Sequence, residues 1–234
     1  NVQQVGGVCG YNNGTIKSCY NTASVSGQNS VGGVCGFNSR GIITNCFNEG
    51  TVSGQTFVGG VCGNGCGVAT TNCFNGGIVS GQSHVSGVCG YDYNYDGTLT
   101  NCYYLSDTAK GGINGKDVSG KAEERSIEQF KSGEVAYLLA EGKALGEQAW
   151  GQQLGKDQYP VPGSDYKVIK AAQGDKDANG NYTYWATFSN LKNDVTLSVP
   201  SDRTLKVYNA TVSGGKMTLT ERNSQVAKDE GVLL

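Results

Sequence analysis

The chain has 234 residues and a formal net charge of −2 at pH 7. This balance excludes the broad basic surface that attracts nucleic acids or anionic membranes, and no apolar run reaches the roughly 20 residues of a membrane-spanning helix. We therefore expect no nucleic-acid partner and no membrane insertion by this segment. The chain is rich in glycine (37 residues) and poor in proline (3) and histidine (1), which favours short strands joined by Gly and Asn turns.

Three sequence blocks recur in the first half of the chain at nearly constant spacing. A Val-x-Gly-Val-Cys-Gly block has periods of 26, 27 and 27 residues, beginning at Val5, Val31, Val58 and Val85. A Cys-aromatic block starts at Cys19, Cys46, Cys73 and Cys102. A Val-Ser-Gly block starts at Val25, Val52 and Val79, and returns only at Val118 in the fourth copy. The fourth copy is therefore expected to carry an insertion, "YLSDTAKGGINGKD".

Each copy holds three short strand-like pieces and is too small to bury its own apolar side. Stacked copies bury that side, because equivalent residues then lie above one another at the strand spacing of about 4.8 Å. A propeller blade needs about 40–45 residues and the common repeats of similar length are helical, so neither architecture fits. We predict a mainly-β fold with a right-handed β-solenoid of about four 26–27-residue rungs over residues 1–120.

The stacking predicts specific ladders of side chains. An aromatic ladder is expected from Tyr20, Phe47, Phe74 and Tyr103, and an aliphatic one from Ile16, Ile43, Thr70 and Leu99. A third ladder, of amides bonded from rung to rung at a turn, is expected from Asn21, Asn48 and Asn75. The paired glycines at 32–33 and 59–60 indicate tight bends or close backbone approach.

The blocks Val-Gly-Gly-Val-Cys-Gly-Tyr/Phe-Asn, Asn-Cys-Phe/Tyr-Asn and Val-Ser-Gly resemble the GLUG repeat of bacterial surface proteins. That family includes regions of large adhesins and of a surface peptidase that cleaves immunoglobulin A. The resemblance covers about residues 5–120. It implies a repeat architecture at the bacterial cell surface or in the extracellular space, and it supplies no catalytic residue.

The first residues, "NVQQVGG", have neither the charged nor the apolar region of a signal peptide. They also begin part-way through a repeat. We therefore expect that a signal segment has been removed or that this is a piece of a longer protein.

Eight of the nine cysteines belong to two ladders, and Cys66 is the exception. In an extracellular protein an even set of cysteines normally indicates disulfides. One cysteine per strand at constant phase instead behaves as a small buried hydrophobe, and stacked parallel neighbours point the same way where a disulfide needs convergence. We expect free thiols, with disulfides between the two ladders within a rung as the alternative.

A zinc site is a further alternative. Cys62, Cys66, Cys73 and His84 would supply three thiolates and an imidazole, which is a known zinc ligand set. However, Cys62 and Cys73 have counterparts in every other rung, where nothing corresponds to Cys66 or His84. The ladders account for these cysteines without a metal, so we expect no metal site and no cofactor.

Residues 121–164 are predicted to form a helical cap and linker. The stretch "SIEQFKSGEVAYLLAEG" indicates two short helices: Ser126 and Gln129 match a capping box, Ser132 is placed to cap the second helix and Gly142 to end it. A solenoid end exposes unpaired strand edges, so we expect the helices to plug that end. Trp150, Leu154 and Tyr159 are interpreted as packing residues.

From residue 165 to 234 the pattern changes to alternation, which predicts five or six strands in a small antiparallel sandwich or barrel. This part resembles a small β domain at the C-terminal end of surface proteins in the Bacteroidetes group. The final "EGVLL" is expected to be an edge strand. "DKDANG" imitates an EF-hand loop, but Ala186 stands where the bidentate acid belongs, so we expect a hairpin turn at Asn179-Gly180.

An enzymatic role finds little support in the repeats. Polysaccharide lyases and hydrolases need clustered acids and bases, whereas residues 5–84 contain only Glu49, Lys17, Arg40 and His84. A His-Glu-x-x-His zinc-peptidase motif is excluded by the single histidine. We expect no catalytic residues.

The stretch "YDYNYDG" is the candidate binding surface. Tyr91, Tyr93 and Tyr95 could stack on sugar rings while Asp92 and Asp96 bond their hydroxyls. The alternative is that the tyrosines pack at a domain junction.

The leading functional hypothesis is a non-enzymatic bacterial surface protein that serves in cell adhesion or as a structural spacer, with host glycans or extracellular matrix proteins as partners. The alternative is a glycan-binding accessory module of a polysaccharide-utilisation system. A polysaccharide lyase or hydrolase is the third hypothesis and the least supported. We expect a monomer.

Overall fold

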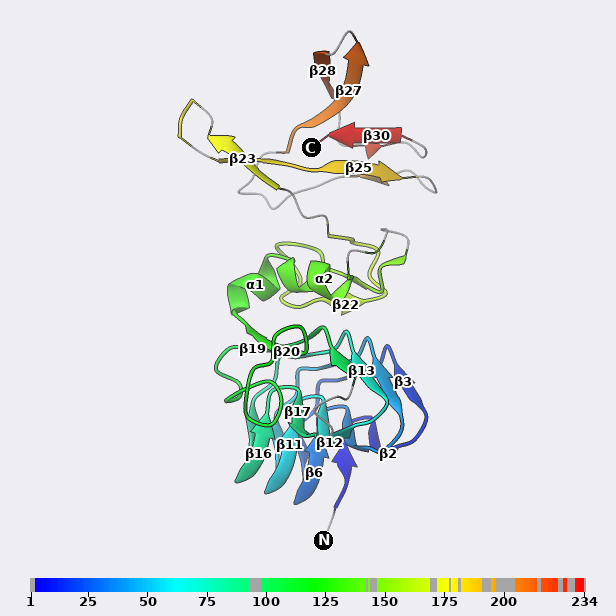
Figure 1. Cartoon of the computed structure of the whole chain (residues 1–234), viewed down its shortest axis with the longest axis vertical. Helices are drawn as coiled ribbons and strands as arrows, with labels where there is room; N and C mark the ends of the chain where they lie inside the picture. Colours follow the sequence, from blue (N-terminus) through cyan, green and yellow to red (C-terminus); the bar gives the residue numbers. More distant parts are fainter. Residues whose placement is uncertain are drawn as a thin grey trace.

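The computed structural model describes residues 3–92, 98–141, 143, 147–168, 172–176, 178–180, 182–190, 195–196, 205–213, 216–222, 225–226 and 230–233. Figure 1 shows a coil of short strands at the N-terminal end of the chain, two short helices beside it, and a group of antiparallel strands at the C-terminal end. The predicted mainly-β fold, with a solenoid, short helices and a small antiparallel β domain, is therefore confirmed.

Five short strands make up each complete rung. The first rung has β1 (Val5–Gly6), β2 (Cys9–Asn12), β3 (Thr15–Lys17), β4 (Tyr20–Asn21) and β5 (Val25–Ser26). The second has β6 (Asn29–Gly32), β7 (Cys35–Asn38), β8 (Ile42–Thr44), β9 (Phe47–Asn48) and β10 (Val52–Ser53). The third has β11 (Thr56–Gly59), β12 (Cys62–Cys66), β13 (Ala69–Thr71), β14 (Phe74–Asn75) and β15 (Val79–Ser80). The fourth has β16 (Ser83–Ser86), β17 (Cys89–Tyr91), β18 (Thr98–Thr100) and β19 (Cys102–Leu105).

Three strands per rung was the wrong prediction, because two apparent strands are each divided. Between β6 and β7 the chain bends at a Gly-Gly pair, and a Cβ on Gly33 would clash with the backbone of Gly60 and the side chain of Asn48. Between β8 and β9 the chain bends at Asn45, whose φ of 54° is left-handed, a conformation that asparagine tolerates better than most residues. The bends repeat in each rung and define its outline.

Equivalent strands pair in parallel without a shift in most of the solenoid. The strand orders are β1-β6-β11-β16, β2-β7-β12-β17, β3-β8-β13-β18, β5-β10-β15 and β4-β9-β14-β19, with β20 (Ala122–Arg125) added to the last. The predicted aliphatic ladder is confirmed: Ile16 pairs with Ile43, Ile43 with Thr70, and Thr70 with Leu99. The cysteine ladders pack with it in one core, and valines form a second core.

The predicted asparagine ladder is also confirmed. Asn21 Nδ2 donates to Asn48 Oδ1 at 2.7 Å, and Asn48 Nδ2 donates to Asn75 Oδ1 at 2.8 Å. Each amide also donates to a carbonyl two residues on, such as Gly50 O at 2.7 Å. Asn48 and Asn75 are fully buried, so these bonds satisfy groups that no water reaches.

The fourth copy contains a shortened fifth rung instead of an insertion. Val79 N–H donates to Thr108 O at 2.9 Å, just as Val52 N–H donates to Ile78 O at 2.8 Å, so Ala109 occupies the valine position. Ile113 forms a parallel bridge with Cys89, and β20 pairs with β19. The alignment of Val118 with the Val-Ser-Gly block was wrong, because Val118 forms an antiparallel bridge with Ala122.

The helices cover a side of the solenoid, and the shortened fifth rung covers its end. Helix α1 (Ile127–Lys131) has the predicted capping box, with Gln129 N–H donating to Ser126 Oγ at 3.3 Å. Helix α2 (Glu134–Leu139) starts after Gly133, which has a φ of 85° and takes the N-cap position expected for Ser132; Ser132 Oγ still accepts a hydrogen bond from Glu134 N–H at 3.4 Å. The strands β21 (Trp150–Gly151) and β22 (Val161–Pro162) follow. Gly142 lies outside the described residues.

The predicted aromatic ladder is confirmed, and it lies on the outer side of the solenoid under the helices. Tyr20 stacks on Phe47 with ring centroids 5.1 Å apart, and Phe47 stacks on Phe74 at 5.0 Å. Phe130 and Trp150 pack against Phe74, each at 5.5 Å. The predicted plug at the solenoid end is thus wrong, because the helices bury Phe47, Phe74 and Tyr103 of this ladder and leave Tyr20 exposed.

The C-terminal strands are antiparallel. They are β23 (Ala172–Lys176), β24 (Tyr182–Trp185), β25 (Thr187–Asn190), β26 (Val195–Thr196), β27 (Val207–Ser213), β28 (Lys216–Arg222), β29 (Gln225–Val226) and β30 (Glu230–Leu233). The turn at Asn179-Gly180 joins β23 to β24 as predicted, with a φ of 83° at Gly180. The edge position predicted for the last strand is wrong, because β30 lies between β25 and β27.

None of the eight ladder cysteines, all of which lie in the described part of the chain, forms a disulfide. Six of them are buried, while Cys9 and Cys19 are partly exposed in the first rung. A hydrogen bond with the neighbouring thiol of Cys73, together with burial, raises the pKa of Cys46 far above its ordinary value. The pKa of Cys73 is raised as well, and burial is the main cause. These thiols therefore stay protonated and unreactive while the solenoid is folded.

Replacing the central amide of the asparagine ladder tests its contribution. Asn48→Ala should destabilise the solenoid by about 1–3 kcal/mol for each buried partner left unsatisfied, because Asn21, Gly50 and Asn75 all lose a hydrogen bond. Urea denaturation measures the loss. Asn13→Ala, at an exposed position, is the control, and equal stability of the two variants would contradict a structural role for the ladder.

Thiol titration tests the state of the cysteines. In denaturant, all nine should react with a thiol reagent, because no disulfide is expected. In the native protein the six buried thiols should react only as fast as the chain unfolds, whereas Cys9 and Cys19 should react at once. A denatured count of seven or fewer would show a disulfide and overturn this description.

Candidate functional site

The predicted binding stretch is only partly described. Tyr93, Tyr95 and Asp96 lie outside the described residues. Asp92 is 4% exposed, and Asn114 bonds its main chain on both sides: Asp92 N–H donates to Asn114 Oδ1 at 2.8 Å, and Asn114 Nδ2 donates to Asp92 O at 2.9 Å. The expectation of a surface carboxylate at Asp92 is therefore wrong, since the shortened fifth rung buries it.

Tyr91 does belong to a surface group of aromatic side chains. Its ring centroid lies 5.1 Å from that of Phe57 and 4.8 Å from that of His84, and the rings of Phe57 and His84 are 5.0 Å apart. The tyrosine and phenylalanine are half-buried, whereas His84 is exposed. Three rings from two rungs thus form one contiguous cluster at the side of the solenoid.

Strand pairing extends this cluster along the solenoid. Tyr11, Phe37, Asn64 and Tyr91 occupy the same position in four successive rungs. Tyr11 is 51% exposed, and its ring lies 5.5 Å from that of Phe37. Between the two aromatic groups, Asn64 Nδ2 donates to Ser30 Oγ at 3.5 Å. We call the five rings of Tyr11, Phe37, Phe57, His84 and Tyr91 the aromatic strip.

Two residues of the strip have a strained backbone conformation. Phe57 and His84 have φ values of 57° and 53°, and Ser30 in the same position of the second rung has 49°. Left-handed backbone costs a bulky side chain about 1–3 kcal/mol. At the other left-handed position of the rung the residues are Ser18 in the first rung and then Asn45, Asn72 and Asn101, and asparagine suits this conformation. The rings at 57 and 84 are therefore held at a conformational cost.

Sequence reasoning missed four members of the strip, Tyr11, Phe37, Phe57 and His84. The available signal was one position of the repeat that varies between copies, being Ser30 in the second rung, Phe57 in the third and His84 in the fourth. An aromatic residue at a variable position of a repeat indicates a surface, because core positions keep their size.

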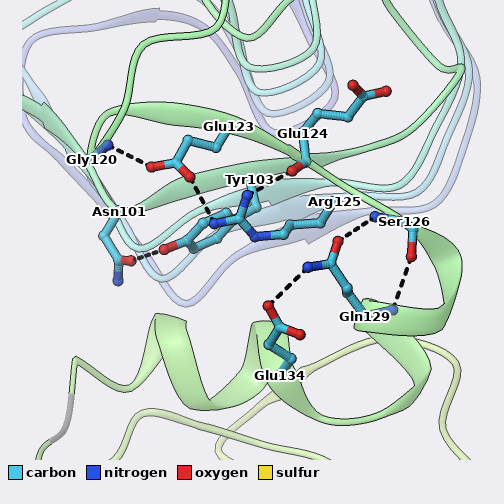
Figure 2. Close-up of polar contacts among 9 residues, drawn as sticks. All are labelled: Asn101, Tyr103, Gly120, Glu123, Glu124, Arg125, Ser126, Gln129 and Glu134. Atoms are coloured by element: carbon cyan, nitrogen blue, oxygen red, sulfur yellow. Dashed lines mark hydrogen bonds and ion pairs between the residues drawn. The ribbon is translucent and has the colours of Figure 1, made fainter.

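A second polar cluster joins the solenoid to the helices (Figure 2). The Arg125 guanidinium lies 4.9 Å from the ring centroid of Tyr103, its Nη2 is 2.7 Å from Glu123 Oε2, and Nη1 donates to Glu124 O at 2.7 Å. Tyr103 donates from its hydroxyl to Asn101 Oδ1, and Asn101 Nδ2 donates to Leu138 O at 2.9 Å. The cluster fixes α2 against the last solenoid strands.

The pKa shifts of Tyr103 and Glu123 in this cluster are those of groups that hold the solenoid and the helices together. Burial raises the pKa of Tyr103 to about 12, so its hydroxyl stays a donor at neutral pH. The Gly120 N–H bonded to Glu123 Oε1, and then Arg125, lower the pKa of Glu123. Glu134 accepts a hydrogen bond from Gln129 Nε2 at 2.9 Å. The carboxylates of Glu123 and Glu134 thus have partners within the cluster, whereas that of Glu124 points away from it (Figure 2).

The described residues contain no group of three or more His, Cys, Asp or Glu side chains that could hold a metal ion. Cys62 and Cys73, considered above for zinc, are fully buried in separate ladders, whereas His84 is exposed and packs on two rings. No helix in the described part of the chain is long and apolar enough to cross a membrane.

The charge of Glu123 should contribute stability in a pH-dependent way. A carboxyl whose pKa is lowered by folding stabilises the folded state above its unfolded-state pKa, and this stabilisation disappears as the pH falls through the folded-state pKa. Wild type should therefore exceed Glu123→Gln in free energy of unfolding at pH 7, and the difference should shrink as the pH falls below the ordinary value of 4.5 and vanish only below the lowered pKa of the folded state.

Urea denaturation at a series of pH values, followed by tryptophan fluorescence, measures this difference. Glu124→Gln, at an exposed neighbouring position, is the matched control. A difference between wild type and Glu123→Gln that stays constant with pH would show that the carboxylate charge is not responsible.

Comparison with known proteins identifies the repeat. The family model described as the GLUG motif matches residues 1–26 and 27–53, which are the first two copies of the period found above. No curated protein and no solved structure matches the chain. The chain therefore contains two GLUG motifs, which cover the first two rungs of the solenoid.

Proposed function

We propose that the chain is a non-enzymatic module of a bacterial surface protein that serves in cell adhesion or as a spacer. The observation that carries this proposal is the aromatic strip, which offers a binding surface on a scaffold with little acid–base chemistry. Between residues 3 and 92 the ionisable acids and bases other than Cys and Tyr are Lys17, Arg40, Glu49, His84 and Asp92. Hydrolysis or elimination needs a positioned acid and base, and Asp92 is buried.

The construction of the solenoid supports presentation of a surface. Amide, aliphatic and thiol ladders run through successive rungs, so each rung is fixed by its neighbours. The helices add a layer of aromatic packing on one side. Such a coil keeps surface residues at fixed spacing, which suits adhesion or the extension of other domains away from a cell.

A glycan-binding accessory module is the second candidate. The exposed rings of the strip favour it, because aromatic faces bind the apolar faces of sugars. Location at the bacterial cell surface or in the extracellular space belongs to both proposals, and the GLUG motif supports it through its resemblance to repeats of surface proteins.

Binding assays with the purified chain test the proposal. Adhesion predicts measurable affinity for immobilised mucin or extracellular matrix proteins, and no release of products from a panel of polysaccharides. The heat-unfolded chain is the control for nonspecific adsorption. Turnover of any polysaccharide would overturn the non-enzymatic assignment, while the absence of binding to every surface would leave the spacer role and reject adhesion.

A further inference from the structure

We propose that the aromatic strip binds an uncharged polysaccharide chain that lies across successive rungs. This inference rests on the binding role proposed above and assigns its site and ligand class. The strip offers Tyr11 and Phe37 in the first two rungs and Phe57, His84 and Tyr91 in the last two. Successive rungs are about 4.8 Å apart, a spacing comparable to the length of one pyranose unit.

Neutral hydrogen-bonding groups flank the rings. Gln28, Gln55 and Gln82 are exposed and stack in a ladder, since Gln55 N–H donates to Gln28 O at 2.9 Å and Gln82 N–H to Gln55 O at 3.0 Å. Beside them, Ser83 Oγ donates to Thr56 Oγ1 at 3.3 Å. Amides and hydroxyls both donate and accept, as the hydroxyls of a sugar chain require.

The charge pattern selects the ligand. In the four rungs that carry the rings, the segments on this side, residues 3–16, 25–38, 52–64 and 79–91, contain no Asp, Glu, Lys or Arg, and the shortened fifth rung adds Lys110 and Lys116 only beyond the last of them. A nucleic acid or an acidic polysaccharide would find no basic side chain in them to neutralise its charge. A neutral glycan needs no such partner, and its hydroxyls match the amides.

The arrangement of the rings favours a narrow ligand over a protein. Asn64 and Ser30 separate the aromatic pair from the aromatic triad, so the apolar surface is interrupted. Protein interfaces centre on a contiguous desolvated core, whereas an extended glycan alternates apolar ring faces with hydroxyl edges. The polar break at Asn64 and Ser30, with the glutamine ladder beside the rings, matches that pattern.

Backbone strain supports a role for the rings themselves. Phe57 and His84 occupy left-handed positions where glycine is favoured. Their replacement by glycine should relax the backbone, so Phe57→Gly/His84→Gly separates folding from binding. The double variant should unfold at the same or a higher temperature than wild type while it loses binding.

The experiment is affinity electrophoresis with soluble neutral polysaccharides (β-glucan, xylan and galactomannan), with alginate and heparin as acidic comparisons. Wild type should be retarded by at least one neutral polymer. The double variant should bind that polymer about tenfold or more weakly, since aromatic contacts are worth about 0.5–1.5 kcal/mol each. Tyr20→Ala removes a 60% exposed ring outside the strip and should bind as wild type does, as should Ser30→Gly.

The remaining outcomes separate this inference from the proposed function. Equal binding by wild type and the double variant would overturn the strip as the site and leave a surface-binding role intact. Binding only to acidic polymers, or only to purified matrix proteins, would overturn the ligand class. No binding to any polymer or protein would overturn both the inference and the adhesion proposal.

Discussion

The structure depends on one constraint, the parallel in-register pairing of successive rungs. Because each residue lies above its counterpart, a polar side chain that hydrogen-bonds to the same residue of the next rung can repeat that bond in every rung. Asn48 shows this best: its amide donates to the rung above and accepts from the rung below. A shift of one residue in any strand would place apolar side chains in solvent and leave buried amides without partners. The register therefore determines the core, the asparagine ladder and the surface positions together.

Much of the solenoid could be predicted from the sequence, because the spacing of the repeats directly gives the register in which the strands pair. Ile16, Ile43, Thr70 and Leu99 align by spacing alone. The division of the rung into five strands could not be predicted, because bends at residues such as Asn45 depend on backbone angles that composition does not specify. The shortened fifth rung was missed for a different reason. Ala109 stands where the Val-Ser-Gly block of the other rungs has valine, so the sequence no longer matches the block although the strands still pair.

The candidate site was predictable only at Tyr91, where the sequence departs visibly from the repeat. Asp92 is adjacent to Tyr91 in the chain, yet the fifth rung buries it, which is a long-range effect that a local motif does not contain. Conversely, the sequence drew attention to His84 only as a possible zinc ligand and not to Phe57 at all, and both come together with Tyr91 only through the coil. Constant positions of the repeat thus reveal the scaffold, and the changing positions reveal what the scaffold presents.

The buried thiols have a consequence for the lifetime of the protein in an oxidising medium. While the coil is intact, six cysteines are buried, and the pKa values of two of them, Cys46 and Cys73, are raised so that these thiols stay protonated. Because the same packing protects them all, a single global opening exposes every thiol at once. A disulfide formed in that interval between cysteines of distant rungs would join residues that lie apart in the coil and would prevent its re-formation. The durability of the solenoid is therefore governed by how rarely it opens, a kinetic property, more than by its equilibrium stability.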